Sequence, residues 1–571
     1  MCPPNPPLCP PNPPPNPPEP EPRELGSELE PPNPELAVMG VPGIARNRPE
    51  SRPSKEINMS ARNTFFTWAR GLVGLGVVAL AWSSAQAQNL LAGAQVLVTT
   101  NSSETATDWA PEVPFAKEGL YDLRLRVTFD VKEKPAAPIL TLKKPAHIVG
   151  WSLNSTELMG PPKDMFYPEL EGIPASALKV GTNVLEARFP FRVHLREGKP
   201  HPATTGKMDL NLQPGDVSRF EIRTGPVLGA AGYDYFTVGC RTRMPATVTL
   251  HCDGRTWTSP PGVIHRLRAT GLQEGKAYEY KLVAKLVGAD VTAETKTWTV
   301  KTLSSKGPWT FVALGDARNN PKIWGRITAH VTKVKPDFVM HTGDIIGNGN
   351  DYEAWDREFA KPAEELLATI PCFYTFGNHE NNVSMIYQIF GFPQDDRSSY
   401  TQVIGPVQIF GMNRFENWGR NSPNLVRMEK ELAASTVPFI FAFTHNPAWS
   451  SGSHGNDKLG NEIHFPIFNE YGVTASIAGH DHCYERSEPG GTTMLIAGGA
   501  GAPLYDPLKA KDNPHSKIYR SEYSFIVFTT GGTKCEMKAY TYGGLKTPDE
   551  ERKLEMIDTR TWEPRQIPAA Q

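Results

Sequence analysis

Short apolar runs that each end in a polar turn recur through the second half of the chain. Residues 309–314 lead into Asp316, and residues 338–340 lead into Asp344. Such a run, closed by a turn, is typical of a buried strand. Because open α/β sheets hold their ligands at the carboxyl ends of their strands, we predict that both aspartates lie at one such edge.

Three more apolar runs end in the same way and supply amide and imidazole groups. They are residues 370–376, 439–443 and 473–478, and their turns contain Asn378 with His379, then His445, then His480 with His482. A single histidine is more often structural than a metal ligand. The recurrence of this pattern at five strand ends predicts instead that these side chains meet at one rim.

Amphipathic stretches separate these runs. Residues 352–368 place large apolar side chains among charged ones, which predicts a helix between two ligand-bearing strands. Strands that alternate with helices from about residue 304 to residue 541 predict an α/β arrangement. We assign residues 303–545 to this domain and residues 546–571 to a C-terminal tail.

A first β module is predicted over residues 88–215. Apolar and polar residues alternate along residues 123–131, as in a half-buried strand. Residues 173–185 resemble a turn and strand of jelly-roll carbohydrate-binding modules, which implies cell-wall or extracellular glycan as a partner. The alternative is a sandwich that serves only as a spacer or docking element.

A second β module is predicted over residues 216–302, where strand-like runs are joined by turns with glycine and proline. Leu272 followed by Tyr278 resembles the turn into a late strand of fibronectin type III sandwiches, which implies that the tyrosine fastens a corner. Cys240 and Cys252 could form a disulfide across neighbouring strands or remain two buried thiols.

The first part of the chain has the features of a leader. Residues 1–58 are dominated by proline and are predicted to be extended or disordered, either as a ligand for proline-binding domains or upstream of a true start at Met59. Residues 59–87 resemble a secretory signal, with an apolar stretch at 71–82 and a cleavage site at 85–87. That stretch is about half as long as a bilayer span, so export to the periplasm or outside the cell is predicted, with a membrane anchor as the alternative.

Composition excludes some classes of partner and site. Among 571 residues the formal net charge is -2, which gives no argument for nucleic acid or an anionic membrane as a partner. The chain has 7 cysteines and no Cys-x-x-Cys motif. Neither a dense disulfide framework nor a thiolate zinc site is therefore predicted.

The side chains gathered at the predicted rim suit phosphate-ester hydrolysis. This reaction needs positive charge on the phosphoryl oxygens and a hydroxide near neutral pH, and two cations about 3.5–4 Å apart supply both. Oxygen and imidazole ligands suit Fe, Mn or Zn. His379 would give the leaving alkoxide its proton. The predicted ligands are Asp344 as a bridge, Asp316 and His482 on one metal, and Asn378, His445 and His480 on the other.

With this ligand set, the chain resembles the calcineurin-like metallophosphoesterases. Their motifs Asp-x-His, Gly-Asp, Gly-Asn-His-Asp/Glu, a later His and Gly-His-x-His occur in order, the first one altered. Residues 444–454, 479–486 and 498–505, and the sandwich before them, are similar to the purple acid phosphatase branch. The resemblance implies a four-layer αββα domain and places His454 near the substrate.

The chain departs from the family pattern at two positions. Arg318 stands where the wider family has histidine after its first aspartate, and Gly347 stands where purple acid phosphatases have a tyrosine ligand. One metal therefore loses a protein ligand, and no purple colour is expected. The guanidinium of Arg318 could contact the substrate phosphate or form a salt bridge with a nearby carboxylate.

We therefore predict a multidomain α+β protein with two β-sandwich modules before a binuclear metallophosphoesterase domain. The expected reaction is attack of a metal-bridging hydroxide on a phosphate ester, with phosphomonoesters expected, His379 as general acid, and Arg318 or His454 as phosphate contacts. One alternative is a phosphodiesterase or nucleotidase of the same fold. Another is a glycan-binding surface protein whose phosphatase domain has decayed.

Overall fold

The computed structural model describes residues 89–566 apart from short gaps. The gaps are residues 93, 101–102, 108–118, 145–147, 149, 194, 197–198, 201–209 and 395–396. The predicted proline-rich segment and signal peptide lie outside the described residues, so both stay predictions. No helix in the described part is long and apolar enough to cross a membrane.

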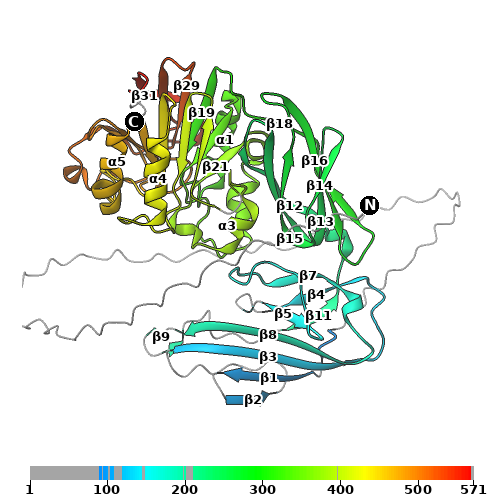
Figure 1. Ribbon diagram of the computed structural model, residues 1–571. Helices are drawn as coiled ribbons and strands as arrows, with labels where there is room; N and C mark the ends of the chain where they lie inside the picture. Colours follow the sequence, from blue (N-terminus) through cyan, green and yellow to red (C-terminus); the bar gives the residue numbers. More distant parts are fainter. Residues whose placement is uncertain are drawn as a thin grey trace, which may run out of the picture. The chain divides into compact units, whose positions relative to one another are not determined.

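The first module is built from antiparallel strands (Figure 1). The strands are β1 (Gln95–Thr100), β2 (Ser103–Thr107), β3 (Gly119–Val131), β4 (Ile139–Lys143), β5 (Trp151–Leu153), β6 (Thr156–Glu157), β7 (Glu169–Pro174), β8 (Gly181–Val193), β9 (Leu195–Arg196), β10 (Lys199–Pro200) and β11 (Asn211–Pro214). One sheet has the order β2-β1-β3-β8-β5-β6 and another has β11-β4-β7. Leu125, Val127 and Phe129 of β3 are buried, which confirms the predicted alternation.

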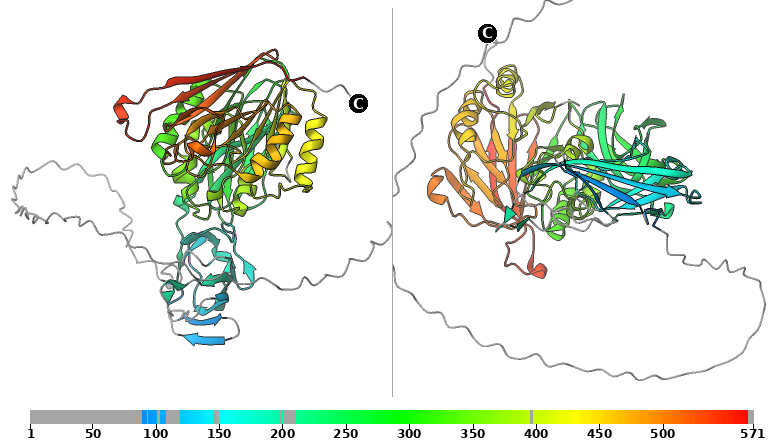
Figure 2. Two further views of the ribbon diagram at one scale, coloured as in Figure 1. Left: turned by 90° about the vertical axis from the view of Figure 1, so that its left-hand side faces the viewer. Right: turned by 90° about the horizontal axis from the view of Figure 1, so that it is seen from below.

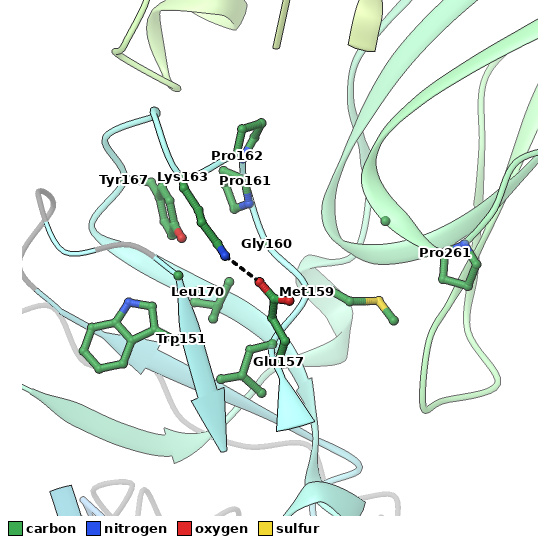
Figure 3. A pocket seen from close by; sticks show the side chains of 13 residues that line it. Trp151, Glu157, Met159, Gly160, Pro161, Pro162, Lys163, Tyr167, Leu170 and Pro261 are labelled. Carbon is green, nitrogen blue, oxygen red and sulfur yellow. Dashed lines mark ion pairs between the residues drawn. The ribbon is translucent and has the colours of Figure 1, made fainter. Parts of the chain in front are cut away.

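A cavity of about 370 Å³ lies beside this module. Trp151 and Tyr167 line it, together with prolines that include Pro261 of the following module. Figure 3 shows Lys163 and Glu157 pointing toward each other, with their charged atoms 2.9 Å apart. Among the described residues that line the cavity, none is a predicted site residue. Glycan binding by this module stays a prediction.

The second module is a sheet of seven strands arranged around one long strand. The strands are β12 (Ile222–Ala231), β13 (Tyr235–Cys252), β14 (Arg255–Thr258), β15 (Gly262–Thr270), β16 (Ala277–Leu286), β17 (Thr292–Glu294) and β18 (Trp298–Lys301). β13 pairs with β12, β14, β15 and β16. Tyr278 Oη accepts a hydrogen bond from Gln273 N at 2.8 Å, as its predicted corner role requires.

The disulfide considered for this module does not form. Cys240 and Cys252 are both free and buried. They lie on the same strand, β13, where Cys240 is near the start and Cys252 is the last residue. Residues so far apart along one extended strand cannot approach to disulfide distance. The alternative of two buried thiols is therefore the correct one.

The C-terminal domain contains two mixed sheets. The first has the order β21 (Cys372–Tyr374), β20 (Phe338–His341), β19 (Trp309–Leu314), β29 (Ser524–Thr530), β30 (Cys535–Thr541) and β31 (Glu555–Trp562). The second has the order β22 (Tyr400–Ile404), β23 (Val407–Gly411), β24 (Phe439–Phe443), β25 (Ala475–Ala478), β27 (Thr493–Ala497), β26 (Tyr484–Ser487) and β28 (Ser516–Arg520).

Buried aromatic rings join the two sheets. Phe441 of β24 lies edge-on to Phe311 of β19 and to Phe528 of β29, with ring centroids 5.2 Å apart in both pairs. In Figure 2 the strands of this domain gather in its interior and helices lie toward its outside. The helices are α1 (Pro321–Val334), α2 (Glu364–Thr369), α3 (Ser384–Ile389), α4 (Pro423–Ala433) and α5 (Phe465–Glu470). This agrees with the predicted mixed α+β organisation, while the four-layer order stays a prediction.

The helix predicted over residues 352–368 is interrupted. Trp355–Ala360 forms a π-helical turn, and α2 begins only at Glu364. Pro362 lies between the two pieces. Its ring clashes with the preceding turn and its nitrogen donates no hydrogen bond, so a continuous helix is broken there.

A loop of the first module contacts the start of α3 and the loop that follows Asp344. The Asp164 carboxylate accepts hydrogen bonds from Ser384 N at 2.6 Å and from Ser384 Oγ at 2.8 Å. Phe166 N donates to the carbonyl oxygen of Asn350 at 2.6 Å. The first module is therefore tied to residues that neighbour the predicted rim in sequence.

Candidate metal centre

The predicted ligands follow the carboxyl ends of parallel strands. Asp316 and Asp344 follow the neighbouring strands β19 and β20, and His445 and His480 follow the neighbouring strands β24 and β25. The φ angles of Asp316, Asp344 and His480 are 58°, 51° and 69°. Residues other than glycine rarely adopt this left-handed conformation, which concentrates at functional sites. These turns therefore adopt strained backbone conformations that place the three side chains.

Asn378, His445 and His480 lie together with Asp344 Oδ1, and we call this the Asn378 side. His445 Nε2 lies 3.1 Å from Asn378 Oδ1, 3.1 Å from His480 Nδ1 and 3.3 Å from Asp344 Oδ1. His445 Nδ1 lies 2.9 Å from the carbonyl oxygen of Thr342. Because a carbonyl oxygen can only accept, Nδ1 carries the proton and Nε2 presents a lone pair to its neighbours.

The chemistry of the Asn378 side fits a metal ion. Burial lowers the pKa of His445, and burial together with His445 and His454 lowers the pKa of His480 to about 2. Both imidazoles are therefore neutral, and each has one ring nitrogen without a proton. Two such nitrogens with an amide oxygen and a carboxylate oxygen form a donor set that suits Fe, Mn or Zn.

Asp316 and His482 lie across Asp344 from these residues, and we call this the Asp316 side. One possible ligand atom from each of Asp316, Asp344 and His482 lies within 4.8 Å of the other two, and all three side chains are buried. The Asp316 carboxylate accepts hydrogen bonds from His480 N at 3.0 and 3.2 Å. His482 Nδ1 lies 2.5 Å from the carbonyl oxygen of Pro503, so this nitrogen carries the ring proton.

Arg318 occupies the Asp316 side as well. Its Nε donates to Asp344 Oδ2 at 3.2 Å, its Nη2 lies 3.3 Å from His482 Nε2, and its Nη1 donates to Asn319 Oδ1 at 2.8 Å. Only 13% of the side chain is exposed. Of the two roles predicted for Arg318, the salt bridge is therefore present, and its partner is the predicted bridging ligand itself.

Asp344 divides its oxygens between the two sides. Oδ1 faces His445 and accepts a hydrogen bond from His379 N at 3.1 Å, while Oδ2 accepts from Arg318. Burial alone would raise the pKa of Asp344, but the neighbouring His445 and His379 outweigh it and lower the pKa to about 2. The carboxylate stays charged, as the bridging role predicted for Asp344 requires.

Two further predicted residues, His379 and His454, stand at the rim. His379 Nδ1 lies 2.7 Å from the carbonyl oxygen of Gly347. His454 stacks on His480 with ring centroids 3.9 Å apart, and its Nδ1 lies 3.0 Å from Asp481 Oδ1. The side chains of His379 and His454 are 30% and 42% exposed, so both can meet a molecule that enters from solvent.

Two residues of the centre, Glu380 and Arg414, have no predicted role. The buried Glu380 carboxylate accepts three backbone N–H groups, those of Asp344, Ile345 and Gly377, at distances of 3.2, 2.6 and 2.5 Å. Glu380 is the last residue of the Gly-Asn-His-Glu motif, and this motif is the sequence signal that could have identified it. Arg414 Nη1 donates to Asn378 Oδ1 at 3.2 Å, and no motif marks it.

Comparison with known proteins shows which family the C-terminal domain resembles. The family model described as calcineurin-like phosphoesterase matches residues 310–484. Acid phosphatase type 7 of Mus musculus is 24% identical over 314 residues, which are 46% of this chain and 70% of that protein. Tartrate-resistant acid phosphatase type 5 of Rattus norvegicus is 26% identical over 236 residues, which are 34% of this chain and 72% of that protein.

A solved structure extends the likeness in fold. A purple acid phosphatase isolated from yellow lupin (Lupinus luteus) seeds superposes with a TM-score of 0.53 and 16% identity, covering 78% of this chain and 93% of that one. Since the identity is low, this likeness speaks for the fold alone. Together, the family match and the acid phosphatase relatives show that the chain contains a calcineurin-like phosphoesterase domain at residues 310–484, which is similar to that of purple acid phosphatases.

Proposed function

We propose that this protein is a metal-dependent phosphoesterase. The observation that carries the proposal is the convergence of Asn378 Oδ1, His480 Nδ1 and Asp344 Oδ1 within 3.1–3.3 Å of His445 Nε2. A metal ion bound there would supply positive charge for the phosphoryl oxygens and lower the pKa of the attacking water. The family expectation of a second ion concerns the Asp316 side, where Arg318 already lies.

His379 is suited to protonate the leaving alkoxide. Because the carbonyl oxygen of Gly347 holds the proton on Nδ1, the imidazolium form carries its other proton on Nε2. Nε2 lies 3.8 Å from Asp344 Oδ2, so it faces the centre. Loss of the Nε2 proton returns His379 to the neutral tautomer that Gly347 stabilises.

His454 and Arg414 are suited to hold the phosphoryl oxygens. Asp481 fixes His454 Nδ1 at 3.0 Å, which leaves Nε2 as the nitrogen that can donate to a substrate. Arg414 already donates to Asn378 on the same side, and its guanidinium has further N–H groups for an anionic oxygen. Substrate binding is therefore expected to be strongest on the Asn378 side.

Turnover of two nitrophenyl esters tests this proposal. The whole purified chain, supplied with Mn or Zn, is expected to hydrolyse nitrophenyl phosphate faster than bis-nitrophenyl phosphate, and a chelator should abolish both reactions. Faster cleavage of the diester would favour the phosphodiesterase alternative. Metal binding without cleavage of either ester would favour a decayed domain.

Export directed by residues 59–87 would place the activity outside the cytoplasm.

A further inference from the structure

The Asp316 side lacks a free imidazole lone pair. His482 Nδ1 gives its proton to the carbonyl oxygen of Pro503 at 2.5 Å, so the ring has one remaining acceptor, Nε2. Arg318 Nη2 lies 3.3 Å from that nitrogen. A single lone pair can accept an N–H group or bind a cation, but not both. While Arg318 holds this position, His482 is not available as a metal ligand.

Arg318 also brings a permanent charge to the space a metal ion would need. Its Nε donates to Asp344 Oδ2 at 3.2 Å, which is the oxygen that faces the Asp316 side. A guanidinium keeps its proton throughout the pH range in which proteins fold. A divalent ion beside it would therefore meet a like charge in a buried site, where repulsion is poorly screened.

The turn that carries Gly347 supplies no replacement ligand, because glycine has no side chain. Gly347 N donates to Glu358 Oε2 at 2.8 Å. A Cβ atom built on Gly347 would lie 3.1 Å from Asn319 Nδ2 and 3.2 Å from Glu358 Oε2. A side chain at this position would require both of these side-chain ends to shift by a few tenths of an ångström. The Asp316 side has two carboxylates, those of Asp316 and Asp344, and Arg318 already contacts Asp344.

Asp316 has a use that needs no metal ion on its own side. Its two oxygens accept the backbone N–H of His480 at 3.0 and 3.2 Å. This holds the strained turn, with a φ of 69° at His480, whose ring belongs to the Asn378 side. Asp316 is therefore a positioning residue for the other side of the centre.

From these contacts we propose that Arg318 takes the place of one metal ion, so that each chain binds a single ion, on the Asn378 side. The guanidinium then serves as the second fixed cation beside Asp344. The proposal rests on the proposed function only in that the Asn378 side is taken to bind metal. It predicts that the centre is mononuclear where the family expectation is a pair of ions.

Metal stoichiometry tests the proposal directly. The whole purified chain is loaded with excess Mn²⁺, separated from free ions by gel filtration, and its metal and protein are quantified. One ion per chain is expected, and two would overturn the proposal. Two ions with ester turnover would leave the proposed function standing, whereas no bound ion and no turnover would overturn both.

Substitution at position 318 provides the matched comparison. Arg318→His restores the family's Asp-x-His pattern and removes the fixed charge, so bound metal is expected to double. Arg318→Lys keeps a positive charge and adds no imidazole, so one ion per chain is expected. A single ion in Arg318→His, or two ions in Arg318→Lys, would contradict the assignment.

A second readout does not depend on how well a variant folds. Electron paramagnetic resonance of the Mn²⁺-loaded unsubstituted chain is expected to show the hyperfine pattern of isolated ions. The signal of an exchange-coupled pair would overturn the proposal, whatever the variants show.

Discussion

The Asn378 side and the Asp316 side share Asp344 but differ in what stands opposite this carboxylate. On the Asn378 side, His445 presents a neutral nitrogen at 3.3 Å, and on the Asp316 side Arg318 presents a charged one at 3.2 Å. Both sides are buried and both consist of residues that follow strand ends, so neither burial nor position in the fold distinguishes them. One residue type decides whether positive charge comes from a bound ion or from the chain.

Asp344→Asn should have the largest effect, because it removes the charge that both sides share. Asparagine has the same shape, so the loss reports charge and not packing. We expect turnover to fall by about 10³-fold, the upper end for a single electrostatic group, and bound metal to fall with it. Unchanged activity on nitrophenyl phosphate would rule out Asp344 as the shared ligand.

Replacing one histidine of each side by alanine tests whether metal binds on the Asn378 side alone. His445→Ala should weaken metal binding by more than about 100-fold, because even the loss of an outer hydrogen-bond partner of a ligand costs 10–100-fold. His482→Ala should weaken it by less than about tenfold by the same scale. Competition against a chromophoric chelator gives both affinities. Equal losses would mean that both sides bind metal.

His379→Ala separates proton donation from metal binding. General acid catalysis contributes about 10²–10⁴-fold, so hydrolysis of an alkyl phosphate should fall by that factor. Nitrophenolate leaves without a proton, so nitrophenyl phosphate should lose far less. Initial rates on the two esters provide the ratio, and equal losses on both would exclude His379 as the acid.

Glu380→Gln tests whether the Glu380 carboxylate stabilises the turn that carries Asp344. The carboxylate accepts three backbone N–H groups, including that of Asp344, and an amide would turn its own N–H groups toward some of them. Leaving buried donors unpaired costs about 1–3 kcal/mol each, so the free energy of unfolding should fall by about 2 kcal/mol. Urea unfolding measures it, and an unchanged midpoint would contradict the role.

The smallest effect is expected at Asp164, in a loop of the first module. Asp164→Ala removes two hydrogen bonds to Ser384, each worth about 1 kcal/mol or less net, so unfolding should become easier by about 1 kcal/mol. Lys163→Ala, next to it and 68% exposed, should change stability by less than about 0.5 kcal/mol. Metal content should be the same in both variants, and a loss of metal in Asp164→Ala would show that the first module supports the centre.

The strand ends of the site could be predicted from the sequence because their signals are local. The apolar runs 309–314 and 439–443 coincide with β19 and β24, and the polar turns after them contain the ligands. Hydrophobic period and turn residues fix such elements without reference to the rest of the chain. The meeting of Asp316 and Asp344 then follows from neighbouring parallel strands of one sheet, whereas His482 reaches them from the other sheet.

What could not be predicted depends on contacts between distant residues. Arg414 reaches Asn378 from a loop with no motif, and Asp164 meets Ser384 across 220 positions. The sequence allows two roles for Arg318, and only the fold determines that its salt bridge uses Asp344. The break at Pro362 was visible in the sequence, but the apolar period around it favoured one helix.

Ester turnover and bound metal measured on the same preparation test the phosphoesterase assignment most directly. The whole chain is stripped with a chelator and reloaded stepwise with Mn²⁺, and nitrophenyl phosphate hydrolysis is followed at each step. We expect turnover to rise in proportion to bound metal and to level off at one ion per chain. Turnover that persists in the stripped protein, or that is absent in the fully loaded protein, would contradict the assignment.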